Sequence, residues 1–215
     1  MFLFILSGLT HVLKLFTYLC PETGQCQGRH IRELVGFRGQ RACDRRLRKL
    51  IEAGYIRREK ILYGVAGIYS NTIRATRVVE GRLAGVNRKI RVEQIMHDIA
   101  VLDTAIFFNK KYGVEFDNIT TESELHRLDG FGVRKHRPDF VITKDDKKIC
   151  VEVELALKAK KRLEKIIYEN FMTYNIQIWI VEDMENKIAQ ILREHQGLYS
   201  DIKIMKLEEV NIWKV

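Results

Sequence analysis

RPDFVI at 137–142, followed after a charged turn by ICVEVEL at 149–155, is the stretch that decides the fold of this chain. Apolar and acidic side chains alternate in the second segment, and Phe140 and Ile142 recur at the same spacing in the first, which predicts two β-strands. The polar run TKDDKK at 143–148 suits a hairpin turn. Closing the hairpin there places Asp139 beside Glu152 and Glu154, with both glutamates on one face because side chains repeat every second residue.

Three carboxylates therefore gather at this hairpin. Carboxylates this close repel one another, which raises their pKa or recruits a cation, and hard oxygen ligands suit Mg²⁺ or Mn²⁺. We expect a metal site with Asp139 and Glu152 as ligands, as in a metal-dependent phosphodiesterase. The alternative is structural: Glu152 and Glu154 form the solvated face of an edge strand and pair with Lys147, Lys148 or Lys158.

The remainder of residues 89–215 alternates helix and strand patterns. Apolar residues recur at helical spacing across 91–111, and 176–181 is a near-continuous apolar run, typical of a strand buried on both faces. The other expected elements are a strand at 112–116, helices at 158–171 and 184–194, and a strand at 202–207. We expect an α/β (α+β) fold in the order αβββαβ, followed by one more helix and strand.

This order and its acids resemble the core of restriction-endonuclease-like nucleases. Asp139 follows Pro138 as in their PD-(D/E)xK signature, and Glu152 lies thirteen residues later on the next strand, where the second acid belongs. The resemblance implies a catalytic set of Asp139, Glu152, Glu154 and Lys158. The sequence departs from the signature at Glu154, which holds the position of the lysine that orients or activates the attacking water. That charge would have to come from the following helix, from Lys158, Lys160 or Lys161; without it the site would bind metal or DNA and cut nothing.

Charge is distributed unevenly along the chain. Residues 1–91 carry 18 Lys and Arg against 6 Asp and Glu, a balance of +12, whereas the remainder carries 19 against 22, a balance of −3. The first part therefore has the charge of a polyanion-binding unit, a role that nucleic acid, a lipid surface or a ribosome would satisfy.

The basic part has the pattern of a winged helix-turn-helix. Periodicity predicts helices at 9–19, 30–35 and 38–53 and two wing strands at 55–63 and 68–70. In such modules the recognition helix enters the major groove and the wing follows a neighbouring phosphate backbone. The arginines at 41, 45 and 48 share one helical face, from which they could reach base edges or phosphates. The expected DNA-binding residues are Gln40, Arg41, Arg45, Arg48, Arg57, Arg58 and Lys60. The alternative is a solvated basic helix with no specific partner.

Over nearly its full length, the chain resembles the replication-relaxation family of plasmid and mobile-element proteins. The features that carry the resemblance are the winged helix, MHDIAV at 96–101, TESEL at 121–125, RPD at 137–139, and EVE at 152–154 followed by basic residues and Tyr168. The resemblance implies a role in the DNA transactions of mobile elements: plasmid replication, relaxation or mobilisation.

We expect two domains: residues 1–88, a winged helix, and residues 89–215, a nuclease-like domain, with a linker at 71–89. Cys43 and Cys150 lie in apolar periodic segments and the four cysteines lack zinc-finger spacing, so we expect buried thiols and a reducing cytoplasm. MFLFIL at 1–6 resembles the start of a signal peptide, but no basic residue precedes it and His11 and Lys14 interrupt the run. We therefore expect no membrane segment, a signal segment being the alternative.

Two functions of different classes fit this pattern. As a nuclease, the protein would hold Mg²⁺ between Asp139 and Glu152, Lys158 would stabilise the developing charge, and the winged helix would deliver double-stranded DNA. As a binding protein, it would be a sequence-specific DNA-binding factor or transcriptional regulator whose nuclease-like domain serves to form a homodimer or to clamp DNA. A regulator that senses a ligand through its C-terminal domain shares this architecture.

Overall fold

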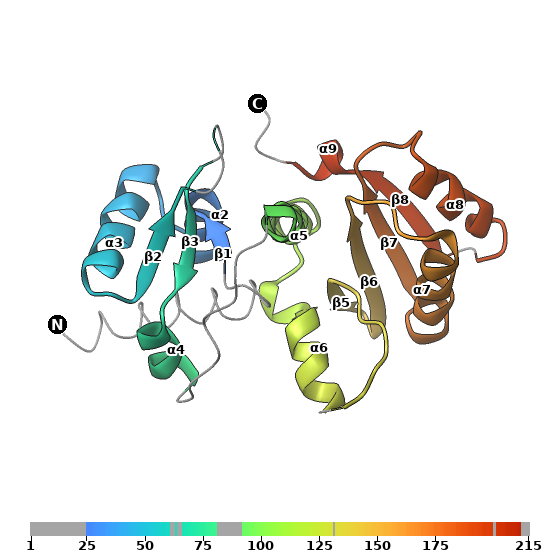
Figure 1. Ribbon diagram of the computed structural model, residues 1–215, viewed down its shortest axis with the longest axis horizontal. Helices are drawn as coiled ribbons and strands as arrows, with labels where there is room; N and C mark the ends of the chain where they lie inside the picture. Colours follow the sequence, from blue (N-terminus) through green and yellow to red (C-terminus); the bar gives the residue numbers. More distant parts are fainter. Residues whose placement is uncertain are drawn as a thin grey trace. The chain divides into compact units, whose positions relative to one another are not determined.

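Two separate β-sheets organise the chain (Figure 1). The computed structural model describes residues 25–60, 63, 66–80, 92–130, 132–199 and 201–211, and across these the fold is mixed α/β with eight α-helices. The chain divides into two units, Met1–Leu102 and Asp103–Val215. The division falls inside helix α5 (Val92–Tyr112). The expected boundary between 88 and 89, the expected first helix and the stretch 1–6 lie outside the described residues.

A three-stranded antiparallel sheet in the order β1-β3-β2 forms the first unit's framework. Its strands are β1 (Gln25–Gln27), β2 (Ile56–Glu59) and β3 (Ile68–Asn71). Helices α2 (Gly28–Val35) and α3 (Gln40–Glu52) lie between β1 and β2 in the sequence, and α4 (Ile73–Glu80) follows β3. The central strand β3 thus pairs with β1 on one side and with β2 on the other.

One apolar stripe of α3 anchors the first unit. Cys43, Leu47 and Leu50 recur at i, i+4 and i+7, and each is at most 3% exposed. Ile31 of α2 and Ile56 of β2 are buried as well, and α3 packs against both of these elements. Burial of an aliphatic side chain of this size contributes about 1.5–3 kcal/mol, so the stripe fixes which face of α3 remains in solvent. The predicted burial of Cys43, and of Cys150 in the second unit, is confirmed.

Two elements of the first unit differ from the sequence expectation. β1 occupies a stretch expected to be a loop, because its three residues form a strand only by pairing with β3, far along the chain. α4 occupies the expected linker at 71–89. Its start is capped by Thr72, whose hydroxyl accepts a 3.4 Å hydrogen bond from the Ala75 N–H.

A five-stranded mixed sheet in the order β4-β5-β6-β7-β8 forms the centre of the second unit (Figure 1). The strands are β4 (Ile119–Thr121), β5 (Phe140–Lys144), β6 (Lys147–Glu154), β7 (Ile176–Val181) and β8 (Ile202–Lys206). β4, β5 and β6 pair antiparallel, whereas β6, β7 and β8 pair parallel. Each parallel connection carries a helix, α7 (Lys160–Thr173) or α8 (Lys187–Gln196), and α9 (Leu207–Val210) follows β8.

Helices cover both faces of this sheet. α7 and α8 pack on one face, where Leu163 and Leu192 are buried together with Trp179 of β7. α5 packs on the other face, with the ring centroid of Phe108 6.4 Å from that of Phe140 in β5. Because Glu152 pairs with Trp179 in the parallel register, Glu152 belongs to the face that α7 and α8 cover.

The hairpin between β5 and β6 is tight. Lys144 pairs with Lys147, so the turn contains only Asp145 and Asp146, whose φ angles of 49° and 59° are both left-handed. Two-residue turns of this kind match the right-handed twist of the flanking strands, and Asp tolerates the left-handed region better than most residues. The predicted hairpin is confirmed, with a shorter turn than the polar run suggested.

The connection from α5 to β5 differs from expectation. The expected strand at 112–116 is the end of α5 and a short link to a 3₁₀ turn, and the strand follows as β4. Helix α6 (Glu122–Asp129) then begins at a capping box, in which Thr121 N–H donates to Glu124 and Glu124 N–H donates to the Thr121 hydroxyl. The second unit therefore has the order αβαββαβαβα.

Candidate functional site

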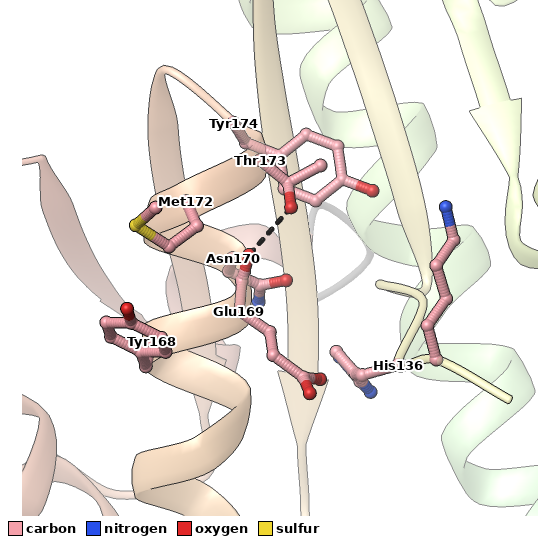
Figure 2. A pocket seen from close by; sticks show the side chains of 8 residues that line it. His136, Tyr168, Glu169, Asn170, Met172, Thr173 and Tyr174 are labelled. Carbon is pink, nitrogen blue, oxygen red and sulfur yellow. Dashed lines mark hydrogen bonds between the residues drawn. The ribbon is translucent and has the colours of Figure 1, made fainter.

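Two segments of the second unit bring the candidate site together. One is the segment before β5, which carries His136, and the other is the second half of α7, which carries Asn170 (Figure 2). Both side chains bind one carboxylate oxygen of Glu152 on β6: His136 Nε2 lies 2.5 Å from Oε1, and Asn170 Nδ2 donates to it over 2.8 Å. Glu152 is only 5% exposed, so these two partners take the place of water around its charge.

His136 and Glu152 hold a proton between them. Burial raises the pKa of Glu152, and the hydrogen bonds from His136 and Asn170 offset only part of that effect. Burial alone would lower the pKa of His136, but the hydrogen bond and charge of Glu152 outweigh it and raise that pKa above the ordinary value. The nearby charge of Asp139 acts in the same direction on both groups. The pKa values of both groups are therefore raised, in a place that water reaches poorly.

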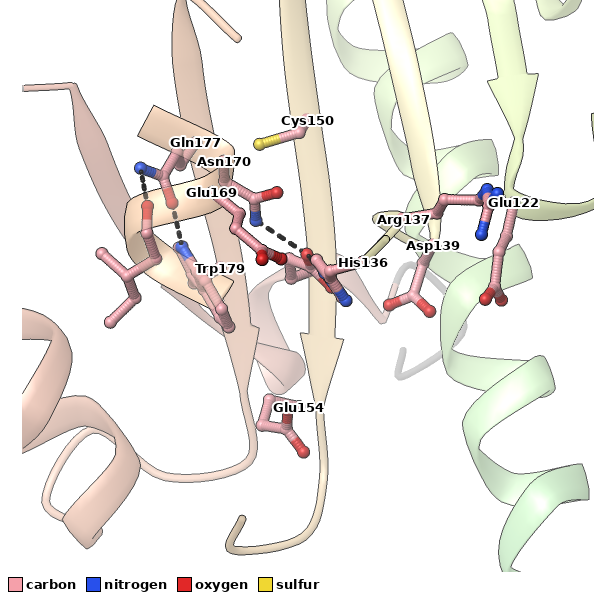
Figure 3. A network of polar contacts seen from close by, with 12 residues as sticks. Glu122, His136, Arg137, Asp139, Cys150, Glu154, Glu169, Asn170, Gln177 and Trp179 are labelled. Atoms are coloured by element: carbon pink, nitrogen blue, oxygen red, sulfur yellow. Dashed lines mark hydrogen bonds and ion pairs between the residues drawn. The ribbon is translucent and has the colours of Figure 1, made fainter. Parts of the chain in front are cut away.

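Asp139 lies at the start of β5, directly across from β6. Phe140 pairs with Val151, so continuing the register by one residue sets Asp139 opposite Glu152, as the hairpin pattern predicted. The Asp139 carboxylate accepts a 2.6 Å hydrogen bond from the Val153 N–H. Figure 3 shows its side chain directed toward the same region as His136.

Glu154 is 5% exposed and forms an ion pair with Lys158, four residues later. Of the three lysines considered as replacements for the motif lysine, Lys158 alone is tied to the carboxylate cluster. Lys160 instead pairs with Glu194 at 3.2 Å and Glu164 at 3.9 Å, whereas Lys161 is exposed and makes no ion pair with a described residue. Lys158 therefore neutralises the buried carboxylate of Glu154.

A buried arginine shapes the segment that carries His136. Arg137 is 6% exposed; its guanidinium donates to Asp129 at 2.7 Å and to the carbonyl oxygens of Lys135 and Val133, both at 3.1 Å. Lys135 also pairs with Asp129 at 2.6 Å. These hydrogen bonds fix the backbone from Val133 to Arg137. His136 lies in this segment and contacts Glu152 on β6.

Sequence reasoning missed His136 and Asn170. His136 stands directly before the RPD stretch, yet only the fold of the segment brings it to Glu152. Asn170 did carry a signal: it continues the buried stripe of Leu163, Ile166 and Ile167 on α7, and a polar residue on an apolar stripe indicates a buried partner. On β7, Gln177 donates to the Ile167 carbonyl at 3.1 Å and accepts from the Trp179 indole at 3.2 Å (Figure 3).

The expected Mg²⁺ or Mn²⁺ site, with Asp139 and Glu152 as its ligands, stays a prediction. Within the described residues no three His, Cys, Asp or Glu side chains are grouped so that they could hold a metal ion. Glu152 and Glu154 each have a cationic partner, His136 and Lys158, and an incoming divalent cation would meet those positive charges.

The exposed face of α3 has a different character. Arg41, Arg45 and Arg48 project from it at i, i+4 and i+7 and are exposed. None of the three makes a hydrogen bond or ion pair with another described residue. Gln40, at the start of the same helix, donates to Asp44 at 2.8 Å, so one acidic residue interrupts this basic face.

The other expected DNA-binding residues lie on or after β2. Arg57 donates to the Ser70 hydroxyl and pairs with Glu59, both at 2.9 Å. Arg58 lies 5.7 Å from the centre of the Tyr69 ring and over Gly67, where a Cβ would come within 2.5 Å of its Nε. Glycine at 67 thus makes room for this arginine. Lys60 is exposed and makes no ion pair within the described part of the chain.

Comparisons with known proteins give no relative. No family model matches the sequence, no curated protein matches it, and no solved structure matches the fold. Across the residues that the structure describes, none of the helices has the length and apolar character needed to cross a bilayer.

Proposed function

We propose that this protein binds double-stranded DNA through the exposed face of α3. The observation that carries the proposal is the row of Arg41, Arg45 and Arg48, which are exposed and have no partner among the described residues. Unpaired guanidinium groups on one helical face can contact base edges and phosphates without first breaking internal ion pairs. The balance of +12 over residues 1–91 supports the same conclusion, because binding to a phosphate backbone depends on such charge.

The order of elements in the first unit supports a winged helix-turn-helix. α2 and α3 follow one another, and the β2–β3 hairpin comes next, with β1 as the third strand. In this class of module the second helix enters the major groove and the hairpin lies along the backbone. Arg58 and Lys60 are then the wing residues nearest the phosphates, whereas Arg57 is partly neutralised by Glu59.

The sheet of the second unit supports a restriction-endonuclease-like domain. Three antiparallel strands lead into two parallel ones through helical connections, and the two acids of the motif face one another at the start of β5 and on β6. Together with the resemblance to the replication-relaxation family, this favours a DNA-binding role in the replication, relaxation or mobilisation of a mobile element. A fold of this kind does not by itself imply cleavage.

Within that role we favour binding without cleavage. The lysine position of the motif holds Glu154, and Lys158 is engaged with it. Glu152 is engaged with His136 and Asn170. The second unit would then serve as a dimerisation or clamping module on the DNA.

Replacing Arg41, Arg45 and Arg48 together by alanine tests the DNA-binding proposal. Loss of three phosphate or base contacts should weaken binding to duplex DNA at least a hundredfold, at about 1–3 kcal/mol per contact, and should reduce the slope of log affinity against log salt by about 3. Fluorescence anisotropy over a salt series measures both. A matched control removes three exposed cations of the second unit, Arg127, Lys187 and Lys203. Full affinity in the arginine variant, or equal loss in the control, rejects α3 as the DNA-binding face.

A Mg²⁺-dependent endonuclease is the second candidate, and the juxtaposition of Asp139 with Glu152 favours it. Supercoiled and linear DNA incubated with Mg²⁺ or Mn²⁺ separates the two functions, with Asp139→Ala as the control. Binding alone predicts that the DNA remains intact with both proteins. Divalent-dependent nicking by the wild type that is lost in Asp139→Ala would establish the nuclease and overturn the non-catalytic role.

A further inference from the structure

The outward face of α7 changes character along the helix. In the first half, its exposed residues are basic: Lys160, Lys161, Arg162 and Lys165. In the second half they include Tyr168, Phe171 and Met172, which are 52%, 38% and 64% exposed. Other residues of α7 form its buried face, so the packing of the core does not account for these three large apolar side chains.

The three residues form one surface with the turn after α8. Positions 168, 171 and 172 are neighbours on a helix, and Figure 2 shows Tyr168 and Met172 on the same side of α7. The Phe171 ring lies against that of Tyr199, with the ring centroids 4.4 Å apart. Leu198 precedes Tyr199 in this turn and is 72% exposed. We call Tyr168, Phe171, Met172 and Leu198 the α7 patch.

The α7 patch is large enough to form the centre of a protein interface. At up to about 200 Å² for a large side chain, its exposed fractions correspond to roughly 400 Å² of mostly apolar surface. The largest apolar patch on a typical monomer has about 300–600 Å² and is often functional. A stable interface buries about 800 Å² on each partner, as an apolar core within a polar rim. The α7 patch has the size of such a core, and the charged first half of α7 lies beside it as a rim.

The charged residues at the edge of the α7 patch carry both signs. Glu164 and Lys165 lie four and three residues before Tyr168, so they belong to the same side of the helix. Lys165 also pairs with Glu169 at 3.6 Å. The whole chain carries a net charge of +9, so two copies repel one another unless they meet on a surface of mixed charge. In a two-fold arrangement of such a surface, acids of one copy can face bases of the other.

We propose that the α7 patch is the surface through which two copies of this chain associate, with α7 against α7 about a two-fold axis. The choice of a second copy as the partner rests on the proposed role of the second unit as a dimerisation module. A dimer carries two α3 helices, and paired helices of this class bind the two half-sites of a palindromic DNA site.

Sedimentation equilibrium of the full chain over a concentration series tests the proposal. Wild type should approach twice the monomer mass of 25.2 kDa. Leu198→Glu and Met172→Glu, made singly, each place two like charges in the interface and should weaken association at least about tenfold. Leu128→Glu is the matched control, because Leu128 on α6 is a leucine of the same exposure, 73%, outside the α7 patch. This control should associate as wild type does.

Exchange of the edge charges provides a second test, which also guards against damage to the fold. Glu164→Lys and Lys165→Glu should each weaken self-association, because each gives the edge of the patch a single sign of charge. A mixture of the two variants should associate more strongly than either alone, because one copy then carries two bases where the other carries two acids. A misfolded variant has no reason to recover when it is mixed with the other.

Three results overturn the proposal: a wild-type monomer throughout the series, equal weakening by the patch and control variants, or a mixture that associates no better than its components. The Arg41, Arg45 and Arg48 alanine variant should dimerise as wild type does, because α3 belongs to the first unit. Its DNA binding is measured separately. Failure of the dimer therefore leaves the α3 assignment intact, and failure of DNA binding leaves the dimer intact.

Discussion

Charged side chains lie in solvent on the exposed face of α3, whereas the carboxylates of Glu152 and Glu154 on β6 are buried. On α3, the three arginines at 41, 45 and 48 are exposed and have no partner among the described residues. In the second unit, Glu152 and Glu154 are buried, each only 5% exposed. Each contacts one basic side chain, His136 or Lys158. Charge kept in water without a partner is available for a ligand, whereas charge taken out of water must be satisfied within the fold.

The difference separates two kinds of evidence for function. An ionisable cluster in a cleft is a candidate active site, but structural ion-pair networks perturb pKa values as well. In the cluster around Glu152 the pKa values of Glu152 and His136 are raised, and the two groups are partners of each other, so their present contacts serve the fold. Arg41, Arg45 and Arg48 of α3 are exposed and make no hydrogen bond or ion pair with a described residue. This favours a partner outside the chain.

The largest effect on stability should come from removing the partner of Glu152. His136→Ala leaves a buried carboxylate with Asn170 alone, and we expect the free energy of unfolding to fall by about 2–3 kcal/mol, somewhat less than the 3–5 kcal/mol typical of a fully buried pair. His126→Ala is the matched control, because His126 is exposed and faces Glu122 at 3.7 Å across a solvated helix surface. It should change stability by less than about 0.5 kcal/mol. Urea denaturation of both variants measures the difference; similar values would mean that the His136–Glu152 pair contributes no more than a surface contact.

A second loss of stability should appear as the pH is raised. The net effect of burial and Glu152 raises the pKa of His136 above 6.5, and burial raises that of Glu152 above 4.5. A group whose pKa is raised by folding contributes stability that is complete below its ordinary pKa and is lost as the pH rises through the folded value. Stability should therefore decline as the pH rises above about 4.5, through the raised pKa of Glu152, and further above about 6.5, through that of His136. Denaturation curves at several pH values test this, and the decline should be smaller in His136→Ala; an identical slope in both proteins would remove the pair as its cause.

The smallest effect should come from the α3 arginines. Arg45→Ala should change the free energy of unfolding by less than about 0.5 kcal/mol, because an exposed side chain without a partner contributes little to the folded state. The same substitution should weaken DNA binding, so the two measurements on one variant contrast sharply. A loss of stability above about 1 kcal/mol would show that Arg45 serves the fold and would weaken the contrast with the second unit.

The parts of the fold that the sequence predicts are those encoded locally. The alternation around Phe140 and Val151 predicts the hairpin and its register, and the stripe at Cys43, Leu47 and Leu50 predicts α3 and its buried face. β1 was missed because three polar-flanked residues become a strand only beside β3. The expected strand at 112–116 was wrong because the long helix α5 continues through Tyr112 and overrides a short β-type pattern.

The site divides in the same way. Asp139, Glu152 and Glu154 are visible in the sequence because strand periodicity puts acids at fixed positions. Asn170 depends on how α7 lies on the sheet, and His136 depends on the buried guanidinium of Arg137. The spacing of Asn170 on the stripe of α7 indicates that it is buried, but only the packing of the fold identifies Glu152 as the partner of both residues. The structural alternative anticipated that Lys158 pairs with one of the two glutamates, and its partner is Glu154. The solvated edge strand of that alternative is wrong, because β6 lies in the middle of the sheet and both glutamates are 5% exposed.

Because the turn contains only Asp145 and Asp146, the number of residues between Asp139 and Glu152 decides whether these two acids meet across the strands. In a strand, adding or removing one residue turns every following side chain to the opposite face. One residue more or fewer between these two acids would point Glu152 at the face packed by α5, away from His136 and Asn170, and would send Val151 or Val153 into its place. Sequence drift in this hairpin can therefore change the identity of residues far more easily than it can change their number.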